Sequence, residues 1–204
     1  MRALTDSGEA AALIERSIEL DELHFANVDL RRVSFAHRTL SRCTFSAVSL
    51  QESLWAGALI EDCSFVDCDL AGARLAATRL RDATFRRARL MGVDFSTIGE
   101  FPAFSLDECD VQLATFVGLT LRKLRCRSCR VTDATFERCD LAQSDFRESD
   151  LRGTRFERCD LTRADLSTAT GVMIDPTQNK VKGAKISRDS AALVAAHFGF
   201  VVGS

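Results

Sequence analysis

Large apolar residues recur at every fifth position along most of this chain. The first series runs from Leu20 through Phe25 to Phe95, which gives sixteen positions, and the second runs from Leu106 to Leu166, which gives thirteen. The residue two positions before each large residue is most often small (Ala, Cys, Ser or Val), and the other three positions are mainly Arg, Asp, Glu, Ser and Thr. Two of every five residues are therefore expected to point into a core and three to point to solvent.

A period of five fits neither a helix nor a flat strand. Five steps of about 100° on an α-helix place successive apolar residues roughly 140° apart, so no single face is apolar. Side chains alternate in a strand, so an odd period sends successive apolar residues to opposite faces. A chain that buries all of them must turn a corner between one and the next, and the pattern predicts a solenoid.

Residue identity repeats every twenty residues, which indicates how many corners close one turn. Phenylalanine recurs at 25, 45, 65 and 85, and leucine recurs at 30, 50, 70 and 90. A three-sided coil would mix Phe and Leu in every column. The pattern therefore favours a square turn built from four pentapeptides.

The chain resembles a pentapeptide repeat protein, whose family motif is A(D/N)LxX. Matches to this motif include CDLAQ at 139–143, SDLRG at 149–153 and CDLTR at 159–163, and the resemblance covers roughly residues 18–168. It implies an all-β fold, a right-handed quadrilateral β-helix. The hand of the coil comes from the family alone, whereas the square section also follows from the spacing.

Length and composition predict one domain. With 204 residues, of which 46% are hydrophobic, the chain can bury a single core, and no segment resembles a linker. We expect an N-terminal lead-in or cap over 1–17, the repeat coil over 18–170, and a C-terminal cap, helix and tail over 171–204. The N-terminal residues lack a basic segment followed by an apolar run, and no apolar stretch approaches about eighteen residues, which predicts a cytoplasmic protein.

All eight cysteines fall at inward positions of the repeat. Seven occupy the small inward position and Cys126 occupies a large one, so the apparent C-x-x-C at 126–129 consists of two consecutive core positions. Pairs such as Cys139 and Cys159 are expected to stack about 4.8 Å apart, which exceeds the ~3.8 Å Cβ separation of a disulfide. We interpret all eight as reduced core residues.

The period breaks once, in the sequence STIGEFPAF at 96–104. Eleven residues separate Phe95 from Leu106 instead of ten, so one residue is inserted, as a bulge or a small loop around Phe101 and Pro102. Column identity survives the break, because the column of Phe95 continues into Phe116. The insertion is either merely tolerated or a functional loop that a partner grips.

The C-terminal segment departs from the repeat. After residue 170 comes a lysine-bearing stretch, and SRDSAALVAAHFG then predicts a short helix that Ser187 or Asp189 caps and Gly199 terminates. The helix and tail carry more apolar surface than one cap requires, so we expect a two-fold homodimer of coils of about seven turns, each roughly 35 Å long at ~4.8 Å per turn. The interface candidates are Leu193, Ala196, Phe198, Phe200 and Val202.

A central insertion, a length near 200 residues and a closing helix followed by GFVVG are similar to one branch of the family. This branch contains the Qnr-type quinolone-resistance proteins, the mycobacterial fluoroquinolone-resistance protein and the microcin and albicidin self-immunity proteins. The resemblance implies a DNA-mimicking dimer that binds DNA gyrase and/or topoisomerase IV and relieves poisoning of the enzyme by a drug. It implies antibiotic resistance or self-immunity, without direct binding of nucleic acid and without a membrane.

The charge of the chain is banded along the sequence. The chain has 29 acidic and 27 basic residues, a net charge of −2, although a DNA mimic should be acidic. Residues 19–69 hold nine acids against four Arg, a net of −5, and residues 74–94 hold six Arg against two Asp, a net of +4. Either adjacent bands neutralise each other, or the N-terminal band imitates DNA. The topoisomerase-binding candidates are Asp21, Glu22, Glu61, Asp62, Asp67, Asp69, Glu100 and Phe101.

No residue pattern indicates catalysis. The three histidines, His24, His37 and His197, have no plausible partner set, and nothing resembles a glycine-rich phosphate loop. The Asp residues that precede the large residues are interpreted as repeat chemistry rather than as paired acid and base. We expect a non-enzyme without cofactor or metal. Two functions remain open, a topoisomerase-binding resistance or immunity protein and a rigid interaction scaffold for an unrelated protein partner.

Overall fold

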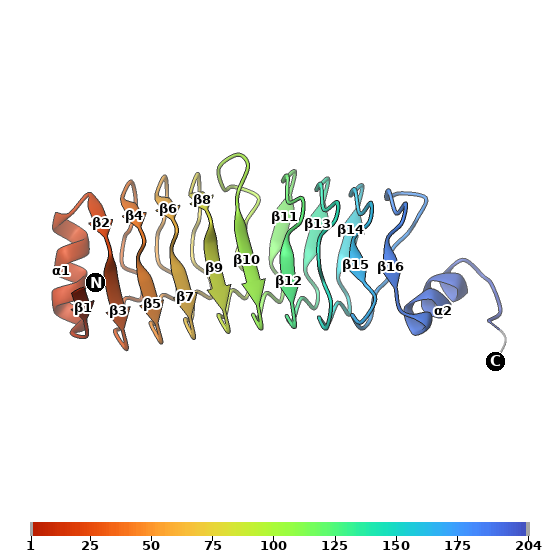
Figure 1. The fold of residues 1–204 in the computed structure, drawn as a ribbon, viewed down its shortest axis with the longest axis horizontal. Coiled ribbons are helices and arrows are strands. Elements are labelled where there is room, and N and C mark those ends of the chain that lie inside the picture. The colour runs from red at the N-terminus through yellow and green to blue at the C-terminus, as the bar shows by residue number, and fades with distance from the viewer. Residues whose placement is uncertain (1, 203–204) are drawn as a thin grey trace.

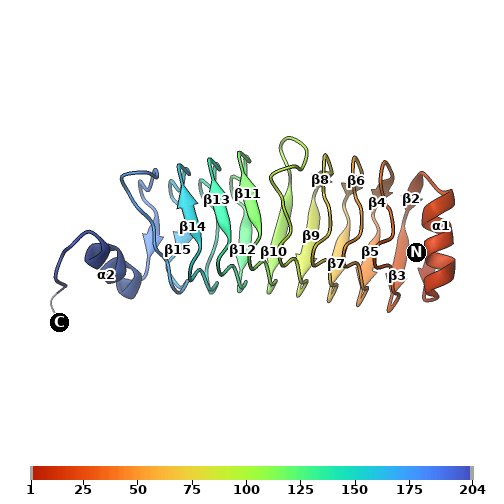
Figure 2. The same cartoon turned by 180° about the vertical axis from the view of Figure 1, so that it is seen from behind.

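The polypeptide coils into an elongated rod whose turns stack one on the next (Figure 1). The computed structural model describes residues 2–202, and the coil makes about nine turns. One helix covers the N-terminal end of the rod, and a second helix follows the last turn at the other end (Figure 2). The protein is an all-β, right-handed quadrilateral β-helix with a short C-terminal helix.

Parallel strands one turn apart build the faces of the rod. The longest ladder joins, in order, β1 (Arg2–Leu4), β3 (Leu23–Ala26), β5 (Thr44–Ser46), β7 (Ser64–Val66), β9 (Ala83–Arg86), β10 (Phe104–Asp107) and β12 (Arg125–Arg127). A second ladder joins β2 (Glu19–Asp21), β4 (Thr39–Ser41), β6 (Leu59–Glu61) and β8 (Arg79–Arg81). The shorter ladders are β11 (Thr115–Val117), β13 (Thr135–Glu137) and β14 (Arg155–Glu157), and the pair β15 (Asp165–Leu166) and β16 (Lys185–Ile186).

The strands pair in a register of twenty residues, so members of one column lie directly above each other. Phe25 pairs with Phe45, and Phe45 pairs with Phe65. Across the break the register becomes twenty-one, because Phe85 pairs with Leu106. The predicted insertion of one residue is therefore confirmed, and the coil continues past it.

Aromatic rings stack along the core of the rod in two columns. The rings of Phe25, Phe45 and Phe65 are nearly parallel, with successive centroids 4.6 and 4.7 Å apart. In the other column Phe95 stacks on Phe116 at 4.7 Å, so the aromatic column crosses the break as predicted. Ring spacing follows the ~4.8 Å separation of the backbone strands, because both repeat once per turn.

Polar side chains at the small inward position bond to the preceding turn. The Sγ of Cys159 donates to the carbonyl oxygen of Phe136 at 3.3 Å, and the Oγ of Ser149 donates to the carbonyl oxygen of Cys126 at 2.9 Å. The Oγ1 of Thr154 donates to the carbonyl oxygen of Val131 at 2.7 Å. Cys, Ser and Thr at this position therefore provide donors for buried backbone carbonyls of the preceding turn.

All eight cysteines are free and buried at the predicted inward positions. Burial raises the pKa of the Cys68 thiol to about 11, so this thiol stays protonated at neutral pH. Cys126 and Cys129 are likewise buried in the core, as consecutive inward residues of the repeat. The C-x-x-C pattern therefore results from the spacing of inward positions in the repeat.

Helix α1 (Ser7–Arg16) closes the N-terminal end of the core. The Asp6 side chain caps it by accepting from the Glu9 backbone N–H at 2.7 Å. At the other end the Arg38 guanidinium donates to the carbonyl oxygen of Ile14 at 2.6 Å. Arg38 thereby fixes the last turn of α1, whose carbonyls have no partner within the helix. Within residues 2–202, neither helix has the length and apolar character needed to cross a bilayer.

The paired turns extend beyond the expected range of 18–170 at both ends. β1 pairs with β3, and β16 pairs with β15, so the lead-in and the C-terminal segment each contribute a strand. The coil has about nine turns rather than the seven expected. At ~4.8 Å per turn, nine turns correspond to a rod roughly 43 Å long.

Replacement of Phe45 or Phe136 by alanine should lower the free energy of unfolding by about 3–5 kcal/mol, because each ring is buried between two stacked rings. Urea unfolding followed by circular dichroism measures this loss. Phe101→Ala is the control, since Phe101 is 77% exposed and its removal should change stability by less than about 0.5 kcal/mol. A loss below about 1 kcal/mol at Phe136 would contradict the register.

Candidate functional site

The described residues offer no assembled catalytic or metal site. Within residues 2–202, no group of three or more His, Cys, Asp or Glu side chains is placed to hold a metal ion. His24 lies 3.1 Å from the Ser46 hydroxyl, and the ring of His197 lies edge-on to Phe198. Three surfaces remain as candidates for function: the N-terminal acidic band, the loop at the break and the C-terminal end.

Most candidate acids of the N-terminal band are paired with an arginine of a neighbouring turn. The carboxylates of Asp21 and Glu22 contact Arg42 at 2.5 and 3.2 Å. The other pairs are Glu61 with Arg81 at 3.5 Å, Asp67 with Arg87 at 2.7 Å and Asp69 with Arg89 at 2.8 Å. Of these six candidate acids, only Asp62 makes no ion pair within residues 2–202.

This pairing changes how the banded charge is interpreted. Exposed ion pairs contribute only about 0–1 kcal/mol each to stability, but they place a positive charge within a few ångströms of each carboxylate. Four of the five pairs join residues twenty positions apart, as Asp67 and Arg87 are. The twenty-residue register could therefore have revealed them in the sequence. The structure favours neutralisation between adjacent turns for these acids.

Aspartates that precede the large inward residue support the backbone of the turns. The carboxylate of Asp150 accepts from the Arg152 backbone N–H at 3.2 Å, and that of Asp160 accepts from Thr162 at 2.9 Å. The same Asx turn recurs at Asp29, Asp69, Asp94, Asp110, Asp140, Asp145, Asp165 and Asp175. The Asp ladder is thus a structural device of the repeat and not a row of free charges.

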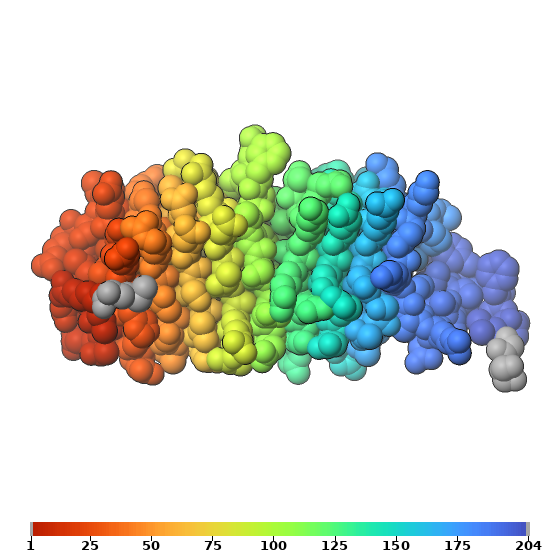
Figure 3. Space-filling model, in the orientation of Figure 1, coloured from red at the N-terminus to blue at the C-terminus, as the bar shows by residue number. Residues whose placement is uncertain are grey.

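The break in the repeat forms a loop that projects from the rod (Figure 3). The backbone N–H of Gly99 still donates to Thr78 at 2.7 Å, and that of Ala103 donates to Leu80 at 3.0 Å. Only residues 100–102 leave the ladder, and the ring of Phe101 among them is exposed. Phe101 has a φ of 52°, a left-handed conformation that it shares with corner residues of ordinary turns such as Asp62 and Leu113. The exposure of its ring on a projecting loop makes the loop a candidate contact site.

The core compensates for the side chain that the loop removes. In ordinary turns of this column a large residue points inward, as Leu80 does, whereas Phe101 points out. Four large residues occupy normally small inward positions around the vacancy: Ile98, Phe104, Leu119 and Leu124. All four are buried, and Phe104 stacks on Phe95 with centroids 5.5 Å apart. Large residues at four normally small positions are a signal that is present in the sequence. A search for large residues at every fifth position does not detect it.

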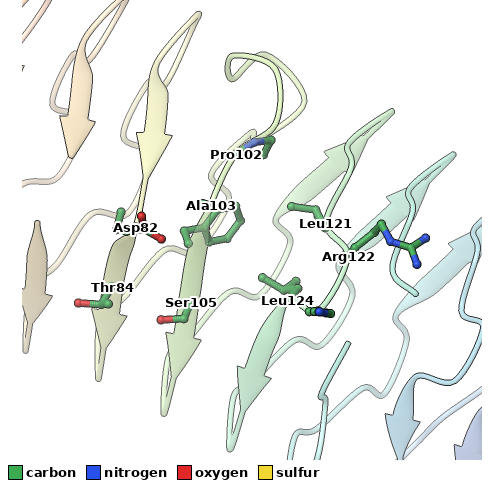
Figure 4. A pocket seen from close by; sticks show the side chains of 11 residues that line it. Asp82, Thr84, Pro102, Ala103, Ser105, Leu121, Arg122 and Leu124 are labelled. Carbon is green, nitrogen blue, oxygen red and sulfur yellow. The ribbon is translucent and has the colours of Figure 1, made fainter. Parts of the chain in front are cut away.

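Two hollows flank the base of the loop. The first, of about 320 Å³, lies among Asp82, Thr84, Ser105 and Lys123 on one side of Pro102 (Figure 4). The second, of about 190 Å³, lies on the other side and is lined by residues that include 96, 98–102 and 117–120. Both hollows border the turn that follows the break, so the loop lies over a gap between this turn and the one before it.

The C-terminal end of the rod is apolar and largely uncovered. Helix α2 (Arg188–His197) has Ser187, one of the two predicted caps, as its N-cap, but Ser190 is its only buried residue. The five interface candidates are all exposed: Leu193, Ala196, Phe198, Phe200 and Val202. An apolar hollow of about 240 Å³ separates Val194 from residues of the last turn such as Val181 and Ile186. One helix therefore does not seal this end.

Comparison with protein families assigns the class of the molecule. The sequence profile of the pentapeptide repeat region matches residues 39–99 and 100–166, which is more than half of the chain. The chain belongs to the pentapeptide repeat family. No protein among those of curated function matches the sequence.

Solved structures with a similar fold include QnrB1, a plasmid-mediated fluoroquinolone resistance protein. A trypsin-treated variant of QnrB1 matches with a TM-score of 0.64 and 20% identity, over 91% of this chain and 90% of that chain. Full-length QnrB1 matches with a TM-score of 0.56 and 20% identity, over 98% of this chain and 95% of that chain. At this identity the likeness establishes a common fold.

Acid should destabilise the protein through its aspartate ladder. Hydrogen bonds from Arg152 and from Thr162 lower the pKa of Asp150 and of Asp160, respectively. A carboxyl with a lowered folded pKa stabilises the protein above its unfolded pKa of about 3.9, and this stability is lost as the pH falls through the folded pKa. We expect constant stability from about pH 7 to 5 and a progressive loss below about pH 4, measured by urea unfolding across a pH series.

Two variants at one position separate charge from hydrogen bonding. Asp150→Asn keeps a side-chain oxygen acceptor for the Arg152 N–H but cannot ionise, so it should reduce the loss of stability below about pH 4. Asp150→Ala removes the acceptor and should cost about 1 kcal/mol at pH 7. An unchanged acid profile in Asp150→Asn would show that Asp150 does not contribute.

Proposed function

We propose that this protein is a non-catalytic rod that imitates DNA, binds a type II topoisomerase in the cytoplasm, chiefly DNA gyrase, and protects it from a poison. The observation that carries the proposal is the likeness over nearly the whole chain to QnrB1, a fluoroquinolone resistance protein, within the same repeat family. The rod shape is suited to the role, because a partner shaped to hold duplex DNA accepts a long, straight body of regular cross-section. The outcome is resistance to an antibiotic or immunity to a self-made toxin.

Charge density limits the mimicry to the N-terminal turns. Duplex DNA as long as the rod, roughly 43 Å, would carry about 25 negative charges at one per ~1.7 Å, whereas the chain has a net charge of −2. Residues 19–69 span about two and a half turns, or roughly 12 Å, for which DNA would carry about seven charges. Their net charge is −5 from nine acids and four Arg. This segment approaches the charge of DNA, although arginines of the next turn offset part of it.

The loop and the N-terminal band together make up the proposed topoisomerase-binding surface. Asp62 and Glu100 make no ion pair within residues 2–202, and Phe101 offers an exposed aromatic anchor beside Glu100. Aromatic anchors are frequent hot spots of protein interfaces. The acids paired with Arg81, Arg87 and Arg89 contribute less, because binding must compete with their own arginines.

The C-terminal end joins two copies in this proposal. A monomer leaves Leu193, Phe198 and Phe200 in water, at exposures of 50%, 40% and 68%. Burial of a few hundred Å² of such surface contributes several kcal/mol at roughly 25 cal/mol per Å², before the entropic cost of association. Two rods joined end to end would reach roughly 85 Å, long enough to span a topoisomerase's DNA-binding surface.

A scaffold for an unrelated protein partner is the second candidate. It is favoured by the ion pairing of the acidic band, which leaves few free charges for DNA mimicry. A supercoiling assay with DNA gyrase, with and without several poisons, distinguishes the two functions. Rescue of supercoiling supports topoisomerase protection, and no effect on either supercoiling or poisoning supports the scaffold.

Reversal of one unpaired acid tests the mimicry. Asp62→Lys should weaken gyrase binding by at least tenfold, measured by surface plasmon resonance at low salt, because it replaces an attractive charge by a repulsive one. Asp133→Lys is the matched control, since Asp133 is also an exposed corner residue with positive φ and without an ion pair within residues 2–202. Equal affinities for the two variants would contradict mimicry by the N-terminal band.

Replacement of one apolar residue tests the assembly. Phe198→Asp should convert a two-fold dimer into a soluble monomer in sedimentation velocity, because a charge would be buried in the apolar interface. Phe101→Asp, at an exposed phenylalanine in the middle of the rod, should leave the dimer intact. A parent protein that is already monomeric at micromolar concentration would refute the dimer.

A further inference from the structure

The break leaves one face of the rod without backbone hydrogen bonds between two successive turns. On this face, which β2, β4, β6 and β8 build and the loop continues, an ordinary gap between turns is bridged. The Asp140 N–H donates to the Leu119 carbonyl oxygen at 2.9 Å, and the Leu121 N–H donates to the Asp140 carbonyl oxygen at 2.8 Å. Within residues 2–202, no backbone hydrogen bond joins residues 96–103 to residues 117–124. We call this the open face.

The neighbouring face stays bound across the same turns. β9 pairs with β10, and β10 pairs with β12. Ion pairs reinforce this ladder, because the Arg125 guanidinium lies 2.8 Å from the Asp107 carboxylate and the Arg86 guanidinium lies 3.6 Å from the Glu108 carboxylate. The turns on the two sides of the break are therefore tied together beside the open face.

The other two faces are also paired at this level of the rod. On the face opposite the open face, the Val111 N–H donates to the Arg130 carbonyl oxygen at 2.8 Å. On the fourth face, the Phe95 N–H donates to the Thr115 carbonyl oxygen at 2.8 Å. Turns that are bound on three sides and free on one can tilt about the bound side, which is the geometry of a hinge.

The core at the break permits such a tilt. The rings of Phe95 and Phe104 lie 5.5 Å apart, a wider spacing than the 4.7 Å between Phe95 and Phe116. Hollows of about 320 and 190 Å³ flank the loop, so space is unfilled on this side of the rod. Apolar contacts are not directional, and a small tilt therefore changes them less than it would change backbone hydrogen bonds.

We infer that the rod is jointed at the break. Residues 2–95 and 104–202 form two arms that tilt against each other, and the gap between them widens and narrows at the open face. The first arm carries the N-terminal acidic band, and the second carries the exposed apolar residues of the C-terminal end. The joint thereby sets the angle between these two surfaces. The inference concerns the free protein and stands whether or not the proposed function is correct.

Distances between spin labels, measured by pulsed electron paramagnetic resonance, test the joint in the free protein. His37→Cys with Arg158→Cys places two labels at the corner beside the open face. Asn27→Cys with Glu148→Cys places two labels at the diagonally opposite corner, next to the bound faces. All four positions are exposed corner residues with positive φ, so the label contributes equally to each pair. Each pair spans about six turns, roughly 29 Å at ~4.8 Å per turn, and each crosses the break.

A tilt changes the spacing at the open corner and leaves the spacing at the bound corner nearly constant. We expect the distance distribution of the His37 and Arg158 pair to be at least twice as wide as that of the Asn27 and Glu148 pair. Equal widths would overturn the joint. The eight native cysteines are buried, so the parent protein should take up less than one-tenth of the label that each double variant takes up.

A variant that closes the break provides the reverse test. Deletion of Gly99 restores the spacing of ten residues between the large positions of Phe95 and Leu106 and places Phe101 at the inward position between them. Pro102→Thr supplies the N–H that proline lacks. Four further changes make room for the ring of Phe101: Ile98→Ala, Phe104→Ala, Leu119→Ala and Leu124→Ala.

In the closed variant the open corner should become as narrow in its distance distribution as the bound corner, because backbone bonds would then bridge all four faces. Circular dichroism and urea unfolding confirm that the variant folds. A folded closed variant that keeps the wide distribution would overturn the inference, since the width would not arise at the break. If the variant does not fold, the comparison of the two label pairs in the uninterrupted parent sequence decides the inference alone.

Discussion

Backbone hydrogen bonding between successive turns is the constraint on which the rest of the structure depends. Parallel strands fix the turns about 4.8 Å apart, and a register of twenty residues then places like residues above each other. The rings of Phe25 and Phe45 stack at 4.6 Å because the backbone has already set that distance. Core, surface ion pairs and Asx turns all follow this register.

The same constraint decides how the acidic residues are used. A carboxylate such as that of Asp150 bonds to its own turn, and one such as that of Asp67 bonds to an arginine one turn away. Acids with such local partners contribute less to the electrostatic field around the protein, through which a binding partner is attracted. The proposed mimicry of DNA therefore depends on the few carboxylates without an ion pair within residues 2–202, such as Glu19 and Asp62 in the N-terminal band.

The break shows how the fold tolerates a local violation of its own rule. Residues 100–102 leave the ladder, and the core volume is refilled by Phe104 and its large neighbours. Side-chain packing can be repaired in this way because apolar contacts are not directional. Backbone hydrogen bonds are directional and cannot be restored in this way, so the backbone N–H and C=O of Thr120 stay unpaired on the side of the loop. The break is therefore well packed inside and unsatisfied at the surface, which is where a partner can act.

The sequence by itself determined the square coil, the inward cysteines and the one-residue insertion, because each follows from a pattern that repeats every five or twenty residues. The structure chose Ser187 over Asp189 as the cap of the C-terminal helix. Only the tertiary structure decided that Arg2–Leu4 adds a strand, since this segment lies outside the repeat. It also showed that Lys185–Ile186 resumes the coil after the irregular stretch that follows residue 170, twenty residues beyond Asp165–Leu166. It also decided which hydrogen bonds the loop keeps at Gly99 and Ala103. A five-residue period specifies where a side chain points, whereas the partner of a backbone group depends on the path of the whole chain around it.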